Sequence, residues 1–208
     1  MKYYFSFFLF LTLNFVFGQQ NTEFKSVKNF FDYQRFMLNN EFKKKFDSES
    51  DFSAKINIKK DFSEFIRRID SIQNTALVGA LIKVKNREDL DRLKIPNLPK
   101  VELANPKKTD LEQEAKYPGG FNNLRGQVAD LFYSDAVLAN QEQLKTSVEF
   151  VVERDGSITS VHAVGDNFTF NRQAEIAMYL LPEKFEPAQI NGMPVRYRFR
   201  LPLAMNFE

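Results

Sequence analysis

The sequence predicts an α+β protein in which a small antiparallel three-stranded sheet is packed by two helices and preceded by a mostly helical region. Apolar side chains alternate with arginines between residues 195 and 203, which is typical of a half-buried strand. Asp155-Gly156 separates two segments with strand-like alternation, as expected of a hairpin. Residues 24–46 instead carry Phe and Met near helical spacing.

Composition excludes several classes of function. The 208 residues include 29 Lys and Arg against 27 Asp and Glu, a balance that disfavours a general nucleic-acid binder. The absence of Cys excludes a disulfide scaffold, a thiolate zinc site and a cysteine nucleophile, and His162 is the only histidine. The 23 Phe favour packing and binding. We therefore expect a protein that is not an enzyme, with no cofactor and no catalytic or metal-binding residues.

The first residues are typical of a secretory signal peptide. Lys2 is followed by an uncharged stretch of mostly Phe and Leu, which ends at Val16-Phe17-Gly18. We place the signal peptide at residues 1–18, which predicts a secreted, periplasmic mature chain. A membrane-spanning helix usually needs about 20 apolar residues, more than this stretch offers. The alternative is an uncleaved segment that anchors the chain in the inner membrane, facing the periplasm.

Residues 19–100 are expected to be mostly helical, and nothing in them indicates a role. Apolar spacing predicts helices over residues 24–46 and 61–73. Residues 80–84 are read as a short strand, and Asn86 as the cap of a further helix.

A linker is expected near residue 100. Pro96, Pro99 and Pro106 lie close together, and prolines at this spacing break helices and favour extended backbone. We assign residues 101–114 to a Pro-containing linker and residues 115–208 to a separate domain.

This domain should begin with a helix and a hairpin. A helix is predicted over residues 120–133, directly after Pro118-Gly119. Residues 147–153 and 157–164 should form the two strands on either side of the Asp155-Gly156 turn.

The rest of the domain supplies a second helix and the last strand. The helix is predicted over residues 170–181 and should end at Pro182. Asn191-Gly192 marks a turn before the strand at residues 195–203. A sheet of three strands leaves at least one edge open, and the last strand is a plausible open edge.

The arginines of the last strand permit two interpretations. They can pair with acidic groups of an incoming segment, or they can form weak cross-strand ion pairs with Glu149 and Glu153. For any single arginine we favour the cross-strand pair. The three arginines are Arg196, Arg198 and Arg200.

The order of these motifs resembles the C-terminal domain of the TonB family, in the form found in Bacteroidetes-type proteins. The matching pieces are Tyr117-Pro118-Gly119-Gly120, the hairpin at 148–158, Phe185-Glu186-Pro187 and the segment from Asn191 to Leu203. Together they cover roughly residues 111–208, a little under half of the chain.

The resemblance implies a function in envelope transport. The C-terminal domain of TonB captures an extended peptide of an outer-membrane transporter along its last strand, and TonB energises that transporter. Such strand addition draws its affinity from main-chain hydrogen bonds. Carried over to this chain, the peptide-binding residues are Tyr117, Pro118, Arg196, Tyr197, Arg198, Phe199, Arg200 and Leu201.

Departures from the family favour recognition over energy transduction. An energy transducer needs a retained membrane helix and a long Pro-rich spacer, whereas this apolar segment is short and the spacer has three prolines. We therefore expect a periplasmic peptide-binding module whose partner is a TonB-dependent transporter or another envelope protein. The alternatives are an anchored energy transducer, if the segment is retained, and a homodimer formed through open sheet edges.

Overall fold

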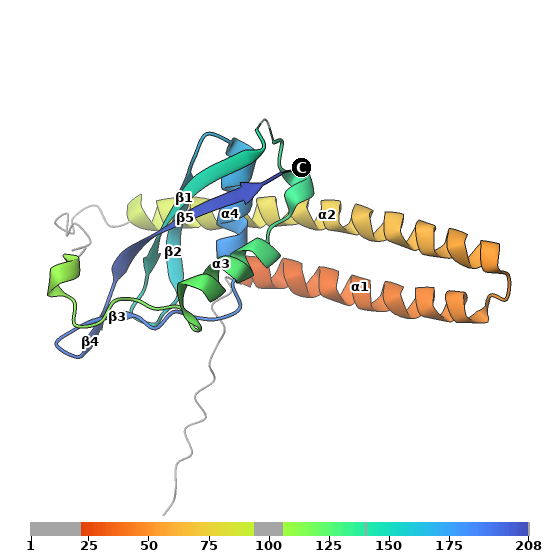
Figure 1. Ribbon diagram of the computed structural model, residues 1–208. Helices are drawn as coiled ribbons and strands as arrows, with labels where there is room; N and C mark the ends of the chain where they lie inside the picture. The colour runs from red at the N-terminus through yellow and green to blue at the C-terminus, as the bar shows by residue number, and fades with distance from the viewer. Residues whose placement is uncertain (1–21, 94–105, 140, 208) are drawn as a thin grey trace, which may run out of the picture.

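The computed structural model describes residues 22–93, 106–139 and 141–207 (Figure 1). The expected signal peptide lies outside these residues, as do Pro96 and Pro99 of the expected linker. The main elements are α1 (Thr22–Ser48), α2 (Phe52–Leu93), α3 (Gly120–Asp130), β1 (Gln143–Val152), β2 (Ile158–Val164), α4 (Phe168–Leu180), β3 (Ala188–Ile190), β4 (Met193–Val195) and β5 (Tyr197–Asn206), with two short 3₁₀ turns at Lys108–Asp110 and Ser134–Ala136.

The main sheet has three antiparallel strands in the order β2-β1-β5. β1 and β5 pair without interruption, from Gln143 opposite Asn206 to Val152 opposite Tyr197. The side chains that alternate along β1 and point into the core are Leu144, Thr146, Val148, Phe150 and Val152. The expected α+β class with a three-stranded antiparallel sheet is therefore confirmed.

The turn between β1 and β2 differs in detail from the expected one. Gly156 has a φ of +80°, whereas Asp155 is not in the left-handed region. The amide of Gly156 donates to the carbonyl of Glu153, which gives a type I turn followed by a left-handed glycine. A Cβ atom on Gly156 would lie 2.0 Å from the carbonyl oxygen of Phe185, so only glycine fits this position.

A second, two-stranded sheet was not expected. β3 and β4 pair around Asn191-Gly192, both of which have positive φ, as a two-residue hairpin turn requires. Lys116 and Glu186 exchange two backbone hydrogen bonds, so the chain just before α3 runs beside the segment that leads into β3. β3 has only three residues, which is too short for alternation to reveal.

The N-terminal half is a long helical hairpin that projects to one side of the sheet (Figure 1). Arg35 of α1 lies 2.5 Å from Asp70 of α2, and the rings of Phe42 and Phe62 stack at 4.1 Å. Asp51 caps the N-terminus of α2, because its side chain accepts a hydrogen bond from the amide of Ala54.

Two expectations for this half were wrong. Residues 80–84 are not a strand, and no separate helix begins at Asn86, because both lie inside α2. The buried residues Leu77, Ala80, Leu81 and Val84 have the three- and four-residue spacing of one helix face. That face packs into the core beneath the sheet, and a short apolar run alone does not separate a buried helix from a strand.

The base of the hairpin and the sheet share one hydrophobic core. Phe24 of α1 is fully buried, and its ring stacks on Tyr179 of α4 at 5.1 Å. α4 ends before Pro182, as expected, and is buried along most of its length. The helices therefore hold one face of the sheet, and their position decides which sheet edge is covered.

Candidate functional site

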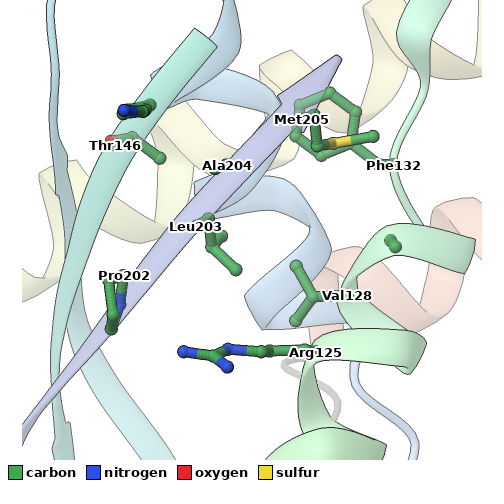
Figure 2. A pocket seen from close by; sticks show the side chains of 10 residues that line it. Arg125, Val128, Phe132, Thr146, Pro202, Leu203, Ala204 and Met205 are labelled. Carbon is green, nitrogen blue, oxygen red and sulfur yellow. The ribbon is translucent and has the colours of Figure 1, made fainter. Parts of the chain in front are cut away.

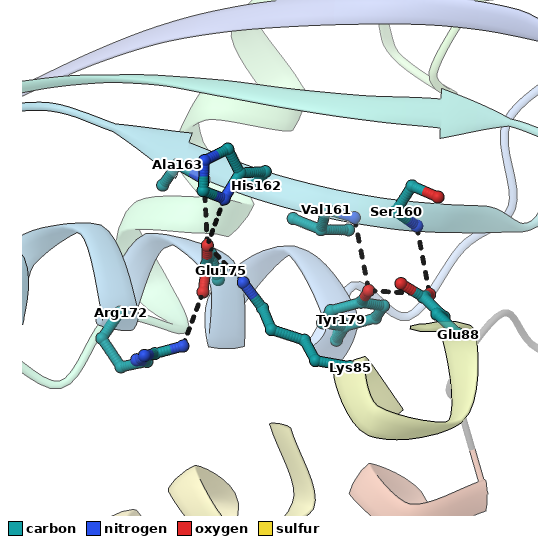
Figure 3. A network of polar contacts seen from close by, with 9 residues as sticks. All are labelled: Lys85, Glu88, Ser160, Val161, His162, Ala163, Arg172, Glu175 and Tyr179. Carbon is teal, nitrogen blue, oxygen red and sulfur yellow. Dashed lines mark hydrogen bonds and ion pairs between the residues drawn. The ribbon is translucent and has the colours of Figure 1, made fainter. Parts of the chain in front are cut away.

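The outer edge of β2 is closed by a buried carboxylate. Oε1 of Glu175 on α4 accepts a hydrogen bond from the backbone amide of Ala163 at 3.0 Å (Figure 3). The same oxygen accepts from Nζ of Lys85 at 2.7 Å, and Oε2 accepts from Arg172 at 3.2 Å. His162 Nδ1 lies 3.5 Å from Oε1, although the imidazole is largely exposed. Glu175 is almost fully buried, and this set of partners compensates its desolvation.

A second group of polar contacts closes the rest of this edge. The hydroxyl of Tyr179 accepts from the amide of Val161 at 3.3 Å and donates to Oε1 of Glu88 at 3.1 Å. Glu88 also accepts from the amide of Ser160 at 3.1 Å (Figure 3). Burial, together with the nearby charge of Glu88, raises the pKa of Tyr179 far above its usual value, so the phenol stays neutral.

β2 is also irregular at this point. The register with β1 shifts where Ser160 adopts a φ of +55°, so two residues of β2 face one residue of β1. Bulges and side-chain caps are both known ways of preventing an edge strand from pairing with another chain.

β5 forms the opposite edge of the same sheet. The amide of Phe207 donates to the carbonyl of Glu142, so odd-numbered residues of β5 direct their backbone hydrogen bonds toward β1. Even-numbered residues direct theirs outward, and in the described part of the chain no strand pairs with them. From residue 200 onward these positions are Arg200, Pro202, Ala204 and Asn206.

Pro202 interrupts this outward row of donors. Its carbonyl faces outward, but its nitrogen carries no hydrogen, so this position cannot donate to another strand. Because the nitrogen does not face β1, the proline costs no bond within the sheet. Proline on an edge strand is a typical device against uncontrolled strand pairing.

Arg196 and Arg200 form cross-strand ion pairs, which is the interpretation favoured over peptide contact from the sequence. Nε of Arg196 lies 2.6 Å from Oε2 of Glu153, and Arg200 lies 3.5 Å from Glu149. Arg196 is outside β5, between β4 and β5. Arg196 and Arg200 therefore have cross-strand acidic partners.

The remaining expected site residues lie at the core side of β5. Tyr117 is buried, its hydroxyl donates to Gln127, and burial raises its pKa to about 12. Pro118 is half-buried, and its carbonyl accepts from Asn123. Tyr197 and Phe199 are half-buried on the core face, whereas Leu201 is fully buried. Tyr117 contributes to the wall of a hollow next to Phe199, so these two expected residues come together.

Two hollows lie between α3 and the core side of β5. The larger one, of about 490 Å³, lies between the second half of α3 and the end of β5 (Figure 2). Figure 2 shows Leu203 of β5 and Val128 of α3 pointing toward one another across it. The smaller one, of about 340 Å³, lies between the start of α3, the segment before it and Phe199. Sequence reasoning missed both, because they depend on how far α3 stands from the sheet.

The larger hollow contains polar groups that lack partners. Thr146 lines it and is 5% exposed, and its hydroxyl has no hydrogen-bond partner among the described residues. Arg125 and Lys145 also line it, and neither forms an ion pair within the described ranges. Arg125 lies over the ring of Phe121 at 4.9 Å.

Other features give no indication of a different site. Across the described residues, no group of three or more His, Asp or Glu is placed to hold a metal ion. None of the described helices combines the length and apolarity needed to cross a membrane. Searches of protein-family models, curated proteins and solved structures found no match to this chain.

Proposed function

We propose that the protein is a peptide-binding module of the bacterial envelope that adds an extended segment of a partner to the outer edge of β5. The observation that carries the proposal is the asymmetry of the sheet. Side chains of α2 and α4 occupy the backbone amides at the β2 edge, whereas the β5 edge has no strand partner among the described residues. Strand addition uses outward amides and carbonyls of this kind.

The partner follows from the expected location and resemblance. A secreted chain with motifs similar to the TonB C-terminal domain is suited to the N-terminal segments of TonB-dependent outer-membrane transporters, or to another envelope protein. In this proposal recognition needs no catalytic group or cofactor. β5 supplies the hydrogen bonds, and the hollows beside α3 contact the side chains of the bound segment.

Titration of the purified protein with a panel of such transporter peptides tests the proposal, with fluorescence anisotropy as the readout. Ala204→Pro removes one outward donor and leaves the bonds to β1 intact, so it should weaken binding about fivefold. Ala204→Val keeps the amide and serves as the matched control. Failure of every peptide to bind the folded protein, or equal binding by both variants, would contradict strand addition at β5.

A further inference from the structure

The two hollows beneath β5 are spaced as two side chains of one extended peptide. Phe199 lines the smaller hollow and Leu203 the larger one. They lie on the same face of β5, four residues apart, which is about 13 Å along a strand. A strand added to β5 would project alternate side chains toward α3, so its residues opposite Phe199 and Leu203 would enter the two hollows.

The linings determine which side chains fit. Apolar side chains form most of the walls of both hollows: Val128, Phe132, Leu203 and Met205 in the larger one, and Phe121, Leu124, Phe185 and Phe199 in the smaller one. Phe199, Leu203 and Met205 are only half-buried in the free protein, unlike the fully buried Val148 and Phe150 of β1. An apolar side chain in each hollow would complete this burial.

The position between the hollows has a different character. Arg125 lies on α3 between Phe121 of the smaller hollow and Val128 of the larger one, and its side chain extends toward β5 (Figure 2). It has no acidic partner among the residues that the structure describes. A peptide residue opposite Leu201 would face α3 at this position, so an acidic side chain there is complementary in charge.

From this spacing, and resting on the proposed function, we propose that the bound segment has the pattern apolar–x–acidic–x–apolar. The two apolar side chains occupy the hollows, and the acidic side chain pairs with Arg125. The pattern reads the same in both directions, so it applies to a parallel or an antiparallel added strand. The larger of the two apolar side chains should lie near Leu203, because that hollow is larger.

Synthetic peptides test the pattern directly. The probe is a labelled heptapeptide of threonines with leucine at positions 2 and 6 and glutamate at position 4, titrated into the purified protein. Moving the second leucine to position 5 places the two leucines on opposite faces of the strand, which should weaken binding at least tenfold. Replacing the glutamate by lysine should weaken binding about fivefold.

Protein variants connect the preference to these residues. Arg125→Glu should reverse the charge preference, so that the lysine peptide binds better than the glutamate peptide. Ala129→Phe should fill the larger hollow and weaken binding of the probe peptide. Asn122→Phe is the control, because Asn122 is on the same helix but lines neither hollow, and it should leave binding unchanged.

The outcomes separate this inference from the proposed function. Preference for the pattern, with charge reversal by Arg125→Glu, supports the inference. If the peptides bind and Ala204→Pro weakens them, but neither leucine spacing nor charge matters, the pattern is overturned and strand addition stands. If no peptide binds, or if sedimentation shows that the chain forms a dimer that excludes peptides, both proposals are overturned.

Discussion

The two edge strands of the sheet, β2 and β5, differ in how their outward backbone groups are satisfied. Both β2 and β5 have backbone groups that point away from β1, and unpaired groups of this kind attract other strands. At β2 the side chains of Glu175, Tyr179 and Glu88 bind these amides, and a bulge distorts the strand. At β5 the pairing with β1 stays regular, and one proline limits the outward donors. The helices therefore cap the backbone amides of the β2 edge, whereas the β5 edge has no further strand among the described residues.

The largest expected effect distinguishes inward from outward positions on β5. Leu203→Pro removes a bond to β1 and part of a packed side chain, and should lower the free energy of unfolding by about 4 kcal/mol. Ala204→Pro removes only an outward amide and should cost less than about 1 kcal/mol. Urea denaturation of both variants measures the difference. Equal losses would show that the assignment of inward and outward residues is wrong.

The next effect concerns the closed edge. Glu175→Leu leaves the amide of Ala163 without an acceptor and removes the partner of Lys85, so it should lower the free energy of unfolding by about 3 kcal/mol. Glu149→Leu serves as the control on the solvent-exposed face of the sheet, because the ion pair of Glu149 with Arg200 is longer and more exposed. This variant should change the free energy of unfolding by less than about 0.5 kcal/mol. Similar losses in the two variants would show that the contacts of Glu175 stabilise the β2 edge no more than an exposed ion pair stabilises the sheet.

A smaller effect is expected at Pro202. Pro202→Thr adds an outward donor to β5 without changing the bonds to β1, and should strengthen peptide binding by about 1 kcal/mol, or about fivefold. The same variant should self-associate more readily, which sedimentation can measure. Unchanged affinity and unchanged association would indicate that the proline does not limit this edge.

The smallest effect is a pH dependence at the turn that joins β1 to β2. Burial raises the pKa of Asp155, but hydrogen bonds from Ser157 and Lys184 outweigh it and lower the pKa to about 2. Because the folded pKa lies below the unfolded value of about 4, the stabilisation is present above pH 4 and is lost as pH falls toward 2.

Asp155→Asn provides the check on this dependence. The stability difference between wild type and Asp155→Asn should shrink between about pH 4 and pH 2, as measured by urea denaturation at each pH. A difference that stays constant over this interval would contradict the assignment.

The open edge could be predicted from sequence far better than the closed one. The alternation between Tyr197 and Leu203 identified β5 and its apolar face, and Asp155-Gly156 located the hairpin. Glu88 and Tyr179 gave no such signal, because they are 91 residues apart and meet only when α2 packs against α4. The hollows were missed for the same reason, since Arg125 is an ordinary exposed helix residue until α3 lies beside β5.

Amide hydrogen exchange, followed residue by residue by NMR, tests the central claim most directly. The amides of Val161 and Ala163 should exchange slowly in the free protein, because side chains bind them, whereas those of Arg200 and Ala204 should exchange fast. A saturating concentration of peptide should slow hydrogen exchange of the Arg200 and Ala204 amides and leave exchange of the Val161 and Ala163 amides unchanged. Slow exchange of Arg200 and Ala204 before any peptide is added would contradict the account.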